Sequence, residues 1–274
     1  MTVTQALAAA QALGLDRLDA QLLLLLALGR PSHERAWLLA HDTDALTPTM
    51  EARFLALAQR RAAGEPLAYL SGVKEFYGLP LQVDARVLDP RPDTETLVDW
   101  ALDCLRDMAA PQVIDLGTGS GAIALAIKHT RPDAQVTAVD ASADALAVAG
   151  ANAQALKLAI ELRQGDWLDG VAARYDLVVS NPPYIAEGDP HLPALQHEPR
   201  QALTAGRDGL DDIRTIVAQA PAHLQPGGWL LLEHGWDQAP AVRALLQGAG
   251  LTEVQSHRDL AGIERCSGGR LPPA

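Results

Sequence analysis

The chain has 274 residues, of which 48% are hydrophobic and 20% charged. This length predicts one large domain or two ordinary ones, and the hydrophobic fraction excludes wholesale disorder. The longest unbroken apolar run, Leu22–Leu28, is far shorter than the roughly 20 residues that a membrane span needs. The N-terminus also lacks the positive charge and apolar stretch of a secretory signal. We therefore expect a soluble, cytoplasmic protein without a membrane partner.

The net charge is -12 and is unevenly distributed. The residues up to Pro90 include 8 basic and 10 acidic side chains, and those from Arg91 onward 14 basic and 24 acidic. A nucleic-acid binder normally presents a basic surface, because neutralising phosphates drives its affinity. The charge therefore argues against a large duplex footprint, and we expect no direct nucleic-acid binding. The two cysteines, Cys104 and Cys266, are far apart and lack metal-ligand spacing, so we predict reduced thiols and no metal site.

The first third of the chain reads as helical. Apolar residues recur at helical spacing, and Thr47-Pro48 has the pattern of an N-cap followed by proline at the first helical position. Four short helices are predicted, over residues 3–13, 18–28, 34–41 and 47–63. The segment Phe76–Val87 then predicts a β-hairpin or an extended linker, because Gly78 and Pro80 interrupt short apolar stretches.

From about residue 94 the pattern changes to short apolar runs that alternate with helical stretches. Such alternation is typical of βαβ units and a parallel sheet covered on both faces. Strands are predicted at residues 113–116, 136–139, 160–163, 177–180 and 229–233, with helices at 122–129 and 143–156.

A glycine-rich loop follows the first of these strands. Gly117, Thr118, Gly119, Ser120 and Gly121 lie between the strand and a helix, where glycines permit a tight turn and close approach of a ligand to backbone N–H groups.

Asp140 ends the next strand, which places a carboxylate beside the loop at the ligand-binding edge, where it can accept both hydroxyls of a ribose. A dinucleotide or S-adenosylmethionine would fit. The dinucleotide fingerprint needs G-x-G-x-x-G, and residue 122 is alanine. The G-x-G-x-G spacing resembles motif I of the class I methyltransferases. Gly165-Asp166-Trp167, after a further strand, resembles the position that contacts adenine in that family, although the spacing of Trp167 fits a core aromatic equally well.

Asn181, Pro182, Pro183 and Tyr184 follow the strand at 177–180 and are the most specific feature of the chain. Two prolines cannot continue a central strand, so the chain must turn at the carboxyl edge. A plain turn could also use Asn-Pro. The tetrapeptide resembles motif IV of methyltransferases that act on planar NH2 groups.

The chemistry of such a nitrogen explains these residue types. Its lone pair is delocalised, so it is a poor nucleophile. The Asn181 side-chain oxygen and the Pro182 carbonyl can each accept a hydrogen bond from one N–H of this nitrogen. Tyr184 can lie against the planar group. Positioning rather than a strong base would then supply much of the rate.

Over nearly its whole length the chain resembles the HemK-type (PrmC) release factor glutamine methyltransferases. Beyond the two motifs, the matching segments are Leu18-Asp19-Ala20, Trp37-Leu38-Leu39-Ala40-His41, Glu75-Phe76-Tyr77-Gly78, Pro90-Arg91-Pro92-Asp93-Thr94-Glu95, Glu198-Pro199, Asp208-Gly209-Leu210-Asp211 and Asp259-Leu260-Ala261-Gly262. Ribosomal-protein glutamine methyltransferases share the catalytic segments but have Pro-Arg-Ser-Pro at the junction. Asp89 departs from the family pattern, which usually has an apolar residue there.

The resemblance implies a Rossmann-like class I methyltransferase sheet (fold class α/β) with a small N-terminal helical bundle and a connecting β-hairpin. The implied domains are a substrate-docking helical domain at 1–74, a hairpin or linker at 75–92 and an S-adenosylmethionine-dependent methyltransferase domain at 93–274. The implied substrate is the glutamine of the Gly-Gly-Gln tripeptide in class I peptide-chain release factors, methylated on its side-chain nitrogen. We also expect a monomer.

The resemblance also implies roles for the motif residues. Asn181, Pro182 and Tyr184 would be catalytic, and Asn181 to Tyr184 would bind the substrate. The cofactor would be held by Gly117 to Gly121, Asp140, Trp167 and Asn181. Two alternatives remain. An adenine-N6 nucleic-acid methyltransferase shares motif IV but would be expected to carry a basic face. A non-catalytic binding module would be expected to have lost these motifs.

Overall fold

The computed structural model describes residues 1–273 and divides the chain into two compact units. The helical unit comprises Met1–Val73 together with the short segment Ala194–His197. The sheet unit comprises Lys74–Pro193 and Glu198–Ala274. Within the described range no helix is long and apolar enough to cross a membrane.

The helical unit is a bundle whose helices begin and end where the sequence predicts. Its helices are α1 (Val3–Ala12), α2 (Arg17–Leu28), α3 (Arg35–Ala40), α4 (Pro48–Ala62) and α5 (Leu67–Ser71). Thr2, Asp16 and Thr47 cap α1, α2 and α4 through their side-chain oxygens, and Gly29 ends α2 in the left-handed region. The core packs the leucines of α2 against Phe54 of α4. The predicted helices are confirmed, but α5, only five residues long, was not predicted.

A β-hairpin leads into the sheet unit, as predicted. Strands β1 (Val73–Phe76) and β2 (Leu79–Gln82) are joined by Tyr77 and Gly78, which both have positive φ. A two-residue turn with both φ values positive matches the twist of the flanking strands.

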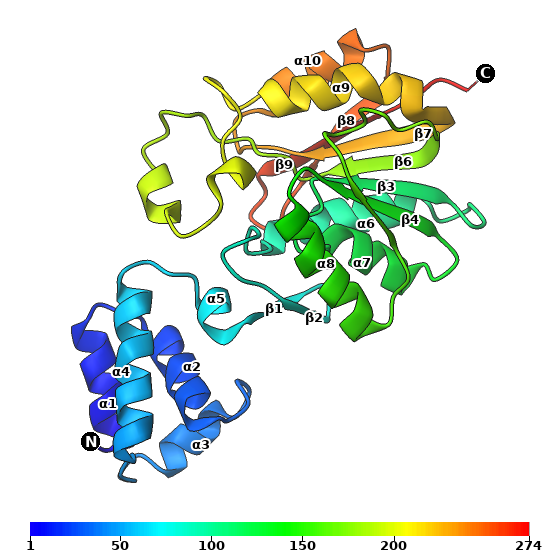
Figure 1. Ribbon diagram of the computed structural model, residues 1–274. Helices are drawn as coiled ribbons and strands as arrows, with labels where there is room; N and C mark the ends of the chain where they lie inside the picture. Colours follow the sequence, from blue (N-terminus) through cyan, green and yellow to red (C-terminus); the bar gives the residue numbers. More distant parts are fainter. Residues whose placement is uncertain (274) are drawn as a thin grey trace. The chain divides into compact units, whose positions relative to one another are not determined.

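The sheet unit is built on one seven-stranded sheet, ordered β5-β4-β3-β6-β7-β9-β8 (Figure 1). The strands are β3 (Gln112–Leu116), β4 (Gln135–Asp140), β5 (Glu161–Gln164), β6 (Tyr175–Ser180), β7 (Leu224–Glu233), β8 (Thr252–Arg258) and β9 (Glu264–Arg270). The first five are parallel, whereas β9 is antiparallel to both β7 and β8. The expectation of a parallel sheet is confirmed for β3 to β7 and was wrong for β8 and β9. β8 and β9 are largely polar or glycine-containing, so they lack the apolar runs by which the other strands were found.

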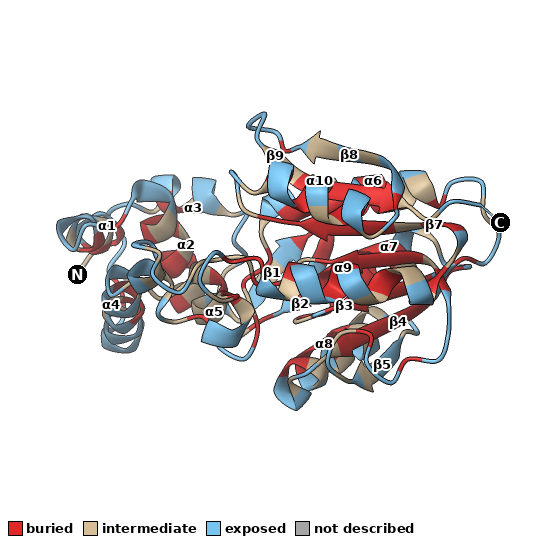
Figure 2. Ribbon diagram, turned by 90° about the horizontal axis from the view of Figure 1, so that it is seen from above, coloured by how far each residue is buried: buried red, intermediate tan, exposed pale blue. Residues whose placement is uncertain are grey.

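Helices cover both faces of the sheet (Figure 1). The helices are α6 (Glu95–Cys104), α7 (Ala122–Thr130), α8 (Ala143–Leu156), α9 (Asp211–His223) and α10 (Ala239–Gly248), and short 3-10 turns lie at Pro92–Thr94, Leu192–Leu195 and Arg200–Ala202. α6, α7 and α8 lie on one face, and α9 and α10 on the other. Figure 2 shows the central strands buried between these layers. The order of the parallel strands reverses between β3 and β6, which is where ligands bind in open α/β sheets.

Candidate active site

Three predicted motifs meet at the carboxyl ends of three adjacent strands. Leu116, the last residue of β3, pairs with Val139 of β4 on one side and with Ser180 of β6 on the other. The residues that follow, Gly117 and Asn181, therefore start side by side, and Asp140 lies beside Gly117. The Ser180 hydroxyl also donates a hydrogen bond of 2.7 Å to the Leu116 carbonyl, which fixes β6 against β3 at this edge.

The Asp140 carboxylate organises the glycine loop as well as facing the pocket. One oxygen accepts the backbone N–H of Gly119 at 2.9 Å, and the other accepts that of Ser142 at 2.9 Å. A carboxylate oxygen can accept more than one hydrogen bond, so Asp140 retains capacity for ligand hydroxyl groups.

Gly117 and Trp167 are in direct contact. A Cβ atom on Gly117 would lie 3.2 Å from the Trp167 ring, and Gly117 has φ of +67°. Trp167 itself adopts a positive φ of 51°, unusual for a bulky residue, and its ring lines the pocket. The indole also lies near the carboxyl of Asp212 and opposes the rise that burial causes in its pKa. Trp167 thus packs on the loop and borders the pocket, and its contact with adenine stays a prediction.

The buried Asp115 carboxyl fixes the glycine-rich loop to the start of α7. Its Oδ2 atom accepts the Thr118 hydroxyl at 2.6 Å and the backbone N–H of Ala124, at the start of α7, at 3.2 Å. The residue is fully buried, and burial raises the pKa of its carboxyl to about 7.

Thr118, Ser120 and Gly121 shape the loop without lining the pocket. Thr118 and Ser120 are buried, and the Ser120 carbonyl accepts the Asn152 side-chain N–H at 2.9 Å. Gly121 lets α7 approach α8, because a Cβ there would lie 3.3 Å from that of Ala149. Contact of these three residues with a cofactor stays a prediction.

Asn181 lines the pocket, and its amide nitrogen donates to the Thr94 hydroxyl at 3.2 Å. Pro183 also lines the pocket, whereas Pro182 and Tyr184 do not. The Tyr184 hydroxyl donates to Glu233 at 3.2 Å, and burial raises the pKa of this phenol.

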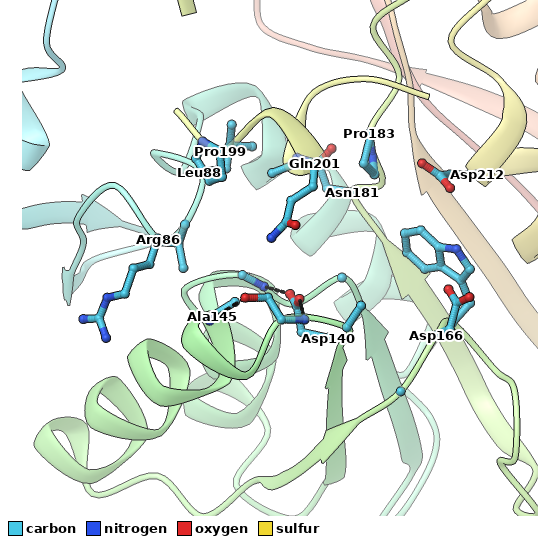
Figure 3. Close-up of a pocket in the computed structure, with 18 residues that line it drawn as sticks. Arg86, Leu88, Asp140, Ala145, Asp166, Asn181, Pro183, Pro199, Gln201 and Asp212 are labelled. Carbon is cyan, nitrogen blue, oxygen red and sulfur yellow. Dashed lines mark hydrogen bonds between the residues drawn. The ribbon is translucent and has the colours of Figure 1, made fainter. Parts of the chain in front are cut away.

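The pocket between these motifs has a volume of about 220 Å³ and is formed entirely by the sheet unit (Figure 3). Of the predicted residues, it brings together Gly117, Gly119, Asp140, Trp167, Asn181 and Pro183. Asp166, which precedes Trp167 in the segment singled out from the sequence, also lines the wall. The sequence did not identify the other residues of the wall, which include Arg86, Leu88, Ala145, Gln201 and Asp212. Most of these come from loops without a recognisable motif.

A buried ion-pair network supports one wall of this pocket. Glu198 accepts the backbone N–H of Asp89 at 3.2 Å and an Arg91 guanidinium N–H at 2.5 Å. Asp89 is buried and pairs with Lys74 at 3.3 Å, which accounts for the unusual acidic residue at this position. The network joins the segment before α6 to the chain just before Pro199 and Gln201. Sequence reasoning assigned no role to Glu198.

The pocket fits S-adenosylmethionine better than a dinucleotide. Three carboxylates, those of Asp140, Asp166 and Asp212, border it, with one guanidinium from Arg86. This surplus of negative charge favours a ligand that carries a sulfonium and disfavours a pyrophosphate. The Trp167 ring offers a flat apolar surface for a nucleobase.

Two family models match the chain. The methyltransferase small domain matches residues 97–246, and the PrmC N-terminal domain matches residues 2–72. A solved Thermus thermophilus 16S rRNA N2 G1207 methyltransferase, in complex with AdoMet and guanosine, superposes with a TM-score of 0.56 at 20% identity. That match covers 73% of this chain and 49% of the other, and it shows a shared fold.

Curated relatives match nearly end to end. The release factor glutamine methyltransferase of Bordetella pertussis is 56% identical, over 94% of this chain and 96% of that protein. The release factor glutamine methyltransferase of Salmonella typhimurium is 44% identical, over 94% and 93%. With these matches and the geometry above, the chain belongs to the release factor glutamine methyltransferase family.

Proposed function

We propose that this protein transfers a methyl group from S-adenosylmethionine to the side-chain nitrogen of the glutamine in the Gly-Gly-Gln tripeptide of class I release factors. One observation carries the proposal: the glycine loop, Asp140 and Asn181 border one pocket at the ends of three adjacent strands. The related release factor glutamine methyltransferases indicate the substrate class.

When bound, S-adenosylmethionine would supply an electrophilic methyl group on its sulfonium, with S-adenosylhomocysteine as the leaving group. The protein's part is to hold the amide nitrogen in line with that methyl group. The amide nitrogen of Asn181 donates a hydrogen bond to Thr94, so the amide oxygen is available to accept a hydrogen bond from the substrate N–H. The Pro182 carbonyl accepts the second N–H. The nitrogen gains the methyl carbon and releases one proton to solvent.

We assign the cofactor to the pocket walls on the same grounds. Asp140 would accept the ribose hydroxyls, Trp167 would pack on the adenine, and the Gly117 to Gly121 loop would let the cofactor approach the backbone. Asn181 lies where the cofactor and the substrate meet, since it lines the pocket and belongs to the tetrapeptide that follows β6.

We assign docking of the release factor to the helical unit. A groove on this unit is lined by Arg17, Leu18, Gln21, His33, Arg35, Ala36 and Leu39. Leu18 and Leu39 are 47% and 64% exposed, and within the described residues neither Arg17 nor Arg35 forms an ion pair. In a chain of net charge -12, this combination suits an apolar patch with acidic neighbours on the release factor. Such a second contact lets one glutamine be selected among many.

The docking assignment is tested with Leu39→Glu. This change should raise KM for an intact release factor at least 10-fold and leave kcat for a short Gly-Gly-Gln peptide unchanged. Leu13→Glu is the matched control, since Leu13 is also exposed, at 44%, but lies outside the groove. An unchanged KM for Leu39→Glu would place the docking surface elsewhere.

The remaining proposals concern the state of the protein in the cell. We propose a cytoplasmic monomer that does not bind nucleic acid directly, because its substrate is a protein and its overall charge is negative.

Peptide mass spectrometry tests the function. A purified class I release factor is incubated with this protein and S-adenosylmethionine, digested and sequenced. One added methyl group on the glutamine of Gly-Gly-Gln supports the proposal. No gain there, with methyl transfer to DNA or RNA in parallel reactions, would replace it with the adenine-N6 activity.

A further inference from the structure

A buried carboxyl group lies directly behind the Asn-Pro-Pro-Tyr motif and has no role in the chemistry above. Glu233 is the last residue of β7, and Ser180 of β6 pairs with Leu232, so Glu233 follows the strand end beside Asn181. Its side chain is 1% exposed. It is therefore the fourth functional residue in a row along this edge, after Asp140, Gly117 and Asn181.

Glu233 contacts two residues that belong to or touch the motif. Its Oε1 atom accepts the Tyr184 hydroxyl at 3.2 Å. The Thr94 hydroxyl lies near enough to this carboxyl to lower its pKa, and the same hydroxyl accepts the Asn181 amide N–H at 3.2 Å. Within residues 1–273 the other oxygen, Oε2, is buried without a hydrogen-bond partner. Burying a carboxyl oxygen without a hydrogen-bond partner destabilises the fold, which suggests a functional reason for Glu233 at this position.

The Thr94 hydroxyl has a single hydrogen to donate, so its hydrogen bonding to Glu233 and to Asn181 is coupled. A hydroxyl donates one hydrogen bond and accepts through its lone pairs. When Glu233 is ionised it can only accept, so Thr94 donates to Glu233 and can only accept from Asn181. This fixes the nitrogen end of the Asn181 amide on Thr94 and leaves the oxygen end for the substrate.

We propose that Glu233 is a positioning residue, which sets the orientation of the Asn181 amide through Thr94 and holds Tyr184 through its hydroxyl. The proposal rests on the proposed function, because the orientation matters when Asn181 accepts a substrate N–H. Glu233 does not line the pocket and acts only through its two neighbours.

Protonation of Glu233 would reverse this arrangement. A protonated carboxyl can donate to Thr94, whose own proton is then free to point at Asn181 and favour the flipped amide. Burial raises the pKa of Glu233 to about 7, against the lowering effects of Thr94, Tyr184 and Arg265, while Asp93 raises it further.

The other groups around Glu233 are Tyr184, whose pKa is raised by burial, and Cys266 on β9, whose pKa burial also raises. Neither titrates near neutrality in that state. Glu233 therefore changes charge near neutrality, and kcat should rise as pH passes through about 7.

The test compares Glu233→Gln with wild type over pH 5.5 to 9, using a release factor substrate. The variant should lower kcat at pH 8 about 10- to 100-fold, flatten the rise near pH 7, and leave the dissociation constant for S-adenosylhomocysteine within threefold of wild type. Glu161→Gln makes the same chemical change on exposed β5 and should match wild type.

Thr94 provides a second, independent pair of variants. Thr94→Val removes the hydroxyl and should reproduce the loss of kcat, whereas Thr94→Ser keeps it and should restore most activity. The double variant Glu233→Gln with Thr94→Val should be no worse than about the poorer single one, because both break the same relay. This pair remains decisive even if Glu233→Gln fails to fold.

Two results would overturn the inference. One is a Glu233→Gln enzyme with wild-type kcat and an unchanged pH profile. The other is a loss of activity in Thr94→Ser equal to that in Thr94→Val. If the wild-type enzyme is active, either of these results removes only the role of Glu233 and leaves the proposed function standing. If the wild-type enzyme methylates no release factor, the proposed function and the role of Glu233 both fail.

Discussion

Gly209 lies so close to the carbonyl of Tyr184 that a Cβ atom there would be 2.2 Å from the Tyr184 oxygen. The same carbonyl accepts the Gln238 side-chain N–H at 3.1 Å. The last residue of the Asn-Pro-Pro-Tyr motif is therefore held by the loop before α9 and by the residue before α10. Neither contact could be inferred from sequence spacing, since these residues are 25 and 54 positions away along the chain.

This contact predicts that Gly209→Ala disturbs the motif. The added methyl group must displace the Tyr184 backbone, and we expect kcat to fall at least 10-fold with a moderate loss of stability. The measurement is kcat with a release factor substrate, beside a thermal melt. Gly250→Ala is the control, because Gly250 also has a positive φ, of +82°, but no atom lies within 4 Å of its added Cβ. Equal activities for the two variants would show that the contact is unimportant.

Asn181→Ala is expected to separate chemistry from cofactor binding. Removing the amide deletes the proposed acceptor for the substrate nitrogen, so kcat should fall by about two to three orders of magnitude. S-adenosylhomocysteine should still bind within a few-fold of wild type, because the contacts of Asp140 and Trp167 remain. Calorimetric titration and single-turnover kinetics measure the two effects. A variant with wild-type turnover would refute the proposed role of Asn181.

Many helices and strands were predictable because a local sequence pattern marks where each one begins or ends. Thr47-Pro48 marks the start of α4, and the apolar run before Gly117 marks β3. Parallel pairing then brings the residues after each strand to the same edge, so Asp140 and Asn181 could be placed near Gly117 from spacing alone.

What the sequence did not predict depends on contacts across the fold. Glu198 and Arg91 are paired over 107 positions, and Glu233 meets Tyr184 over 49. In the sequence, Glu198, Arg91 and Glu233 are isolated charged residues that would equally suit a solvated surface. Burial distinguishes them, and burial is a property of the packed sheet rather than of the local pattern. Strands β8 and β9 were missed for the same reason, because the pairing of β9 with β7 and of β8 with β9 decides their conformation.

Asp140 is expected to be the largest single contributor to cofactor affinity. Asp140→Ala removes the acceptor of the Gly119 and Ser142 N–H groups together with the proposed ribose contact, so binding of S-adenosylhomocysteine should weaken about 10- to 100-fold or more. Asp140→Asn keeps one acceptor oxygen and should lose less. Asp144→Asn, an exposed change on α8, is the control. Unchanged affinity for Asp140→Ala would mean that the cofactor lies elsewhere.

The two fully buried carboxyls should make stability depend on pH in a defined direction. Burial raises the pKa of Asp115 and of Glu233 to about 7 in the folded protein. Between the ordinary carboxyl pKa near ~4 and this value, the folded state binds more protons than the unfolded state. Their contribution to stability is therefore complete below about pH 4 and is lost as pH rises through 7, by up to about 1.4 kcal/mol per pH unit for each group.

Denaturant unfolding of the cofactor-free protein between pH 5 and 8 measures this slope. Carboxylates elsewhere, such as Asp208, whose pKa is lowered to about 2 by Arg214, are ionised throughout this range and do not contribute. Asp115→Asn and Glu233→Gln should each reduce the fall in unfolding free energy, because the amide cannot ionise, whereas exposed Asp107→Asn should leave it unchanged. If stability instead rises from pH 5 to 8 and neither amide variant alters the trend, the two carboxyls are ionised in the folded protein and the orientation of Asn181 cannot depend on the protonation of Glu233.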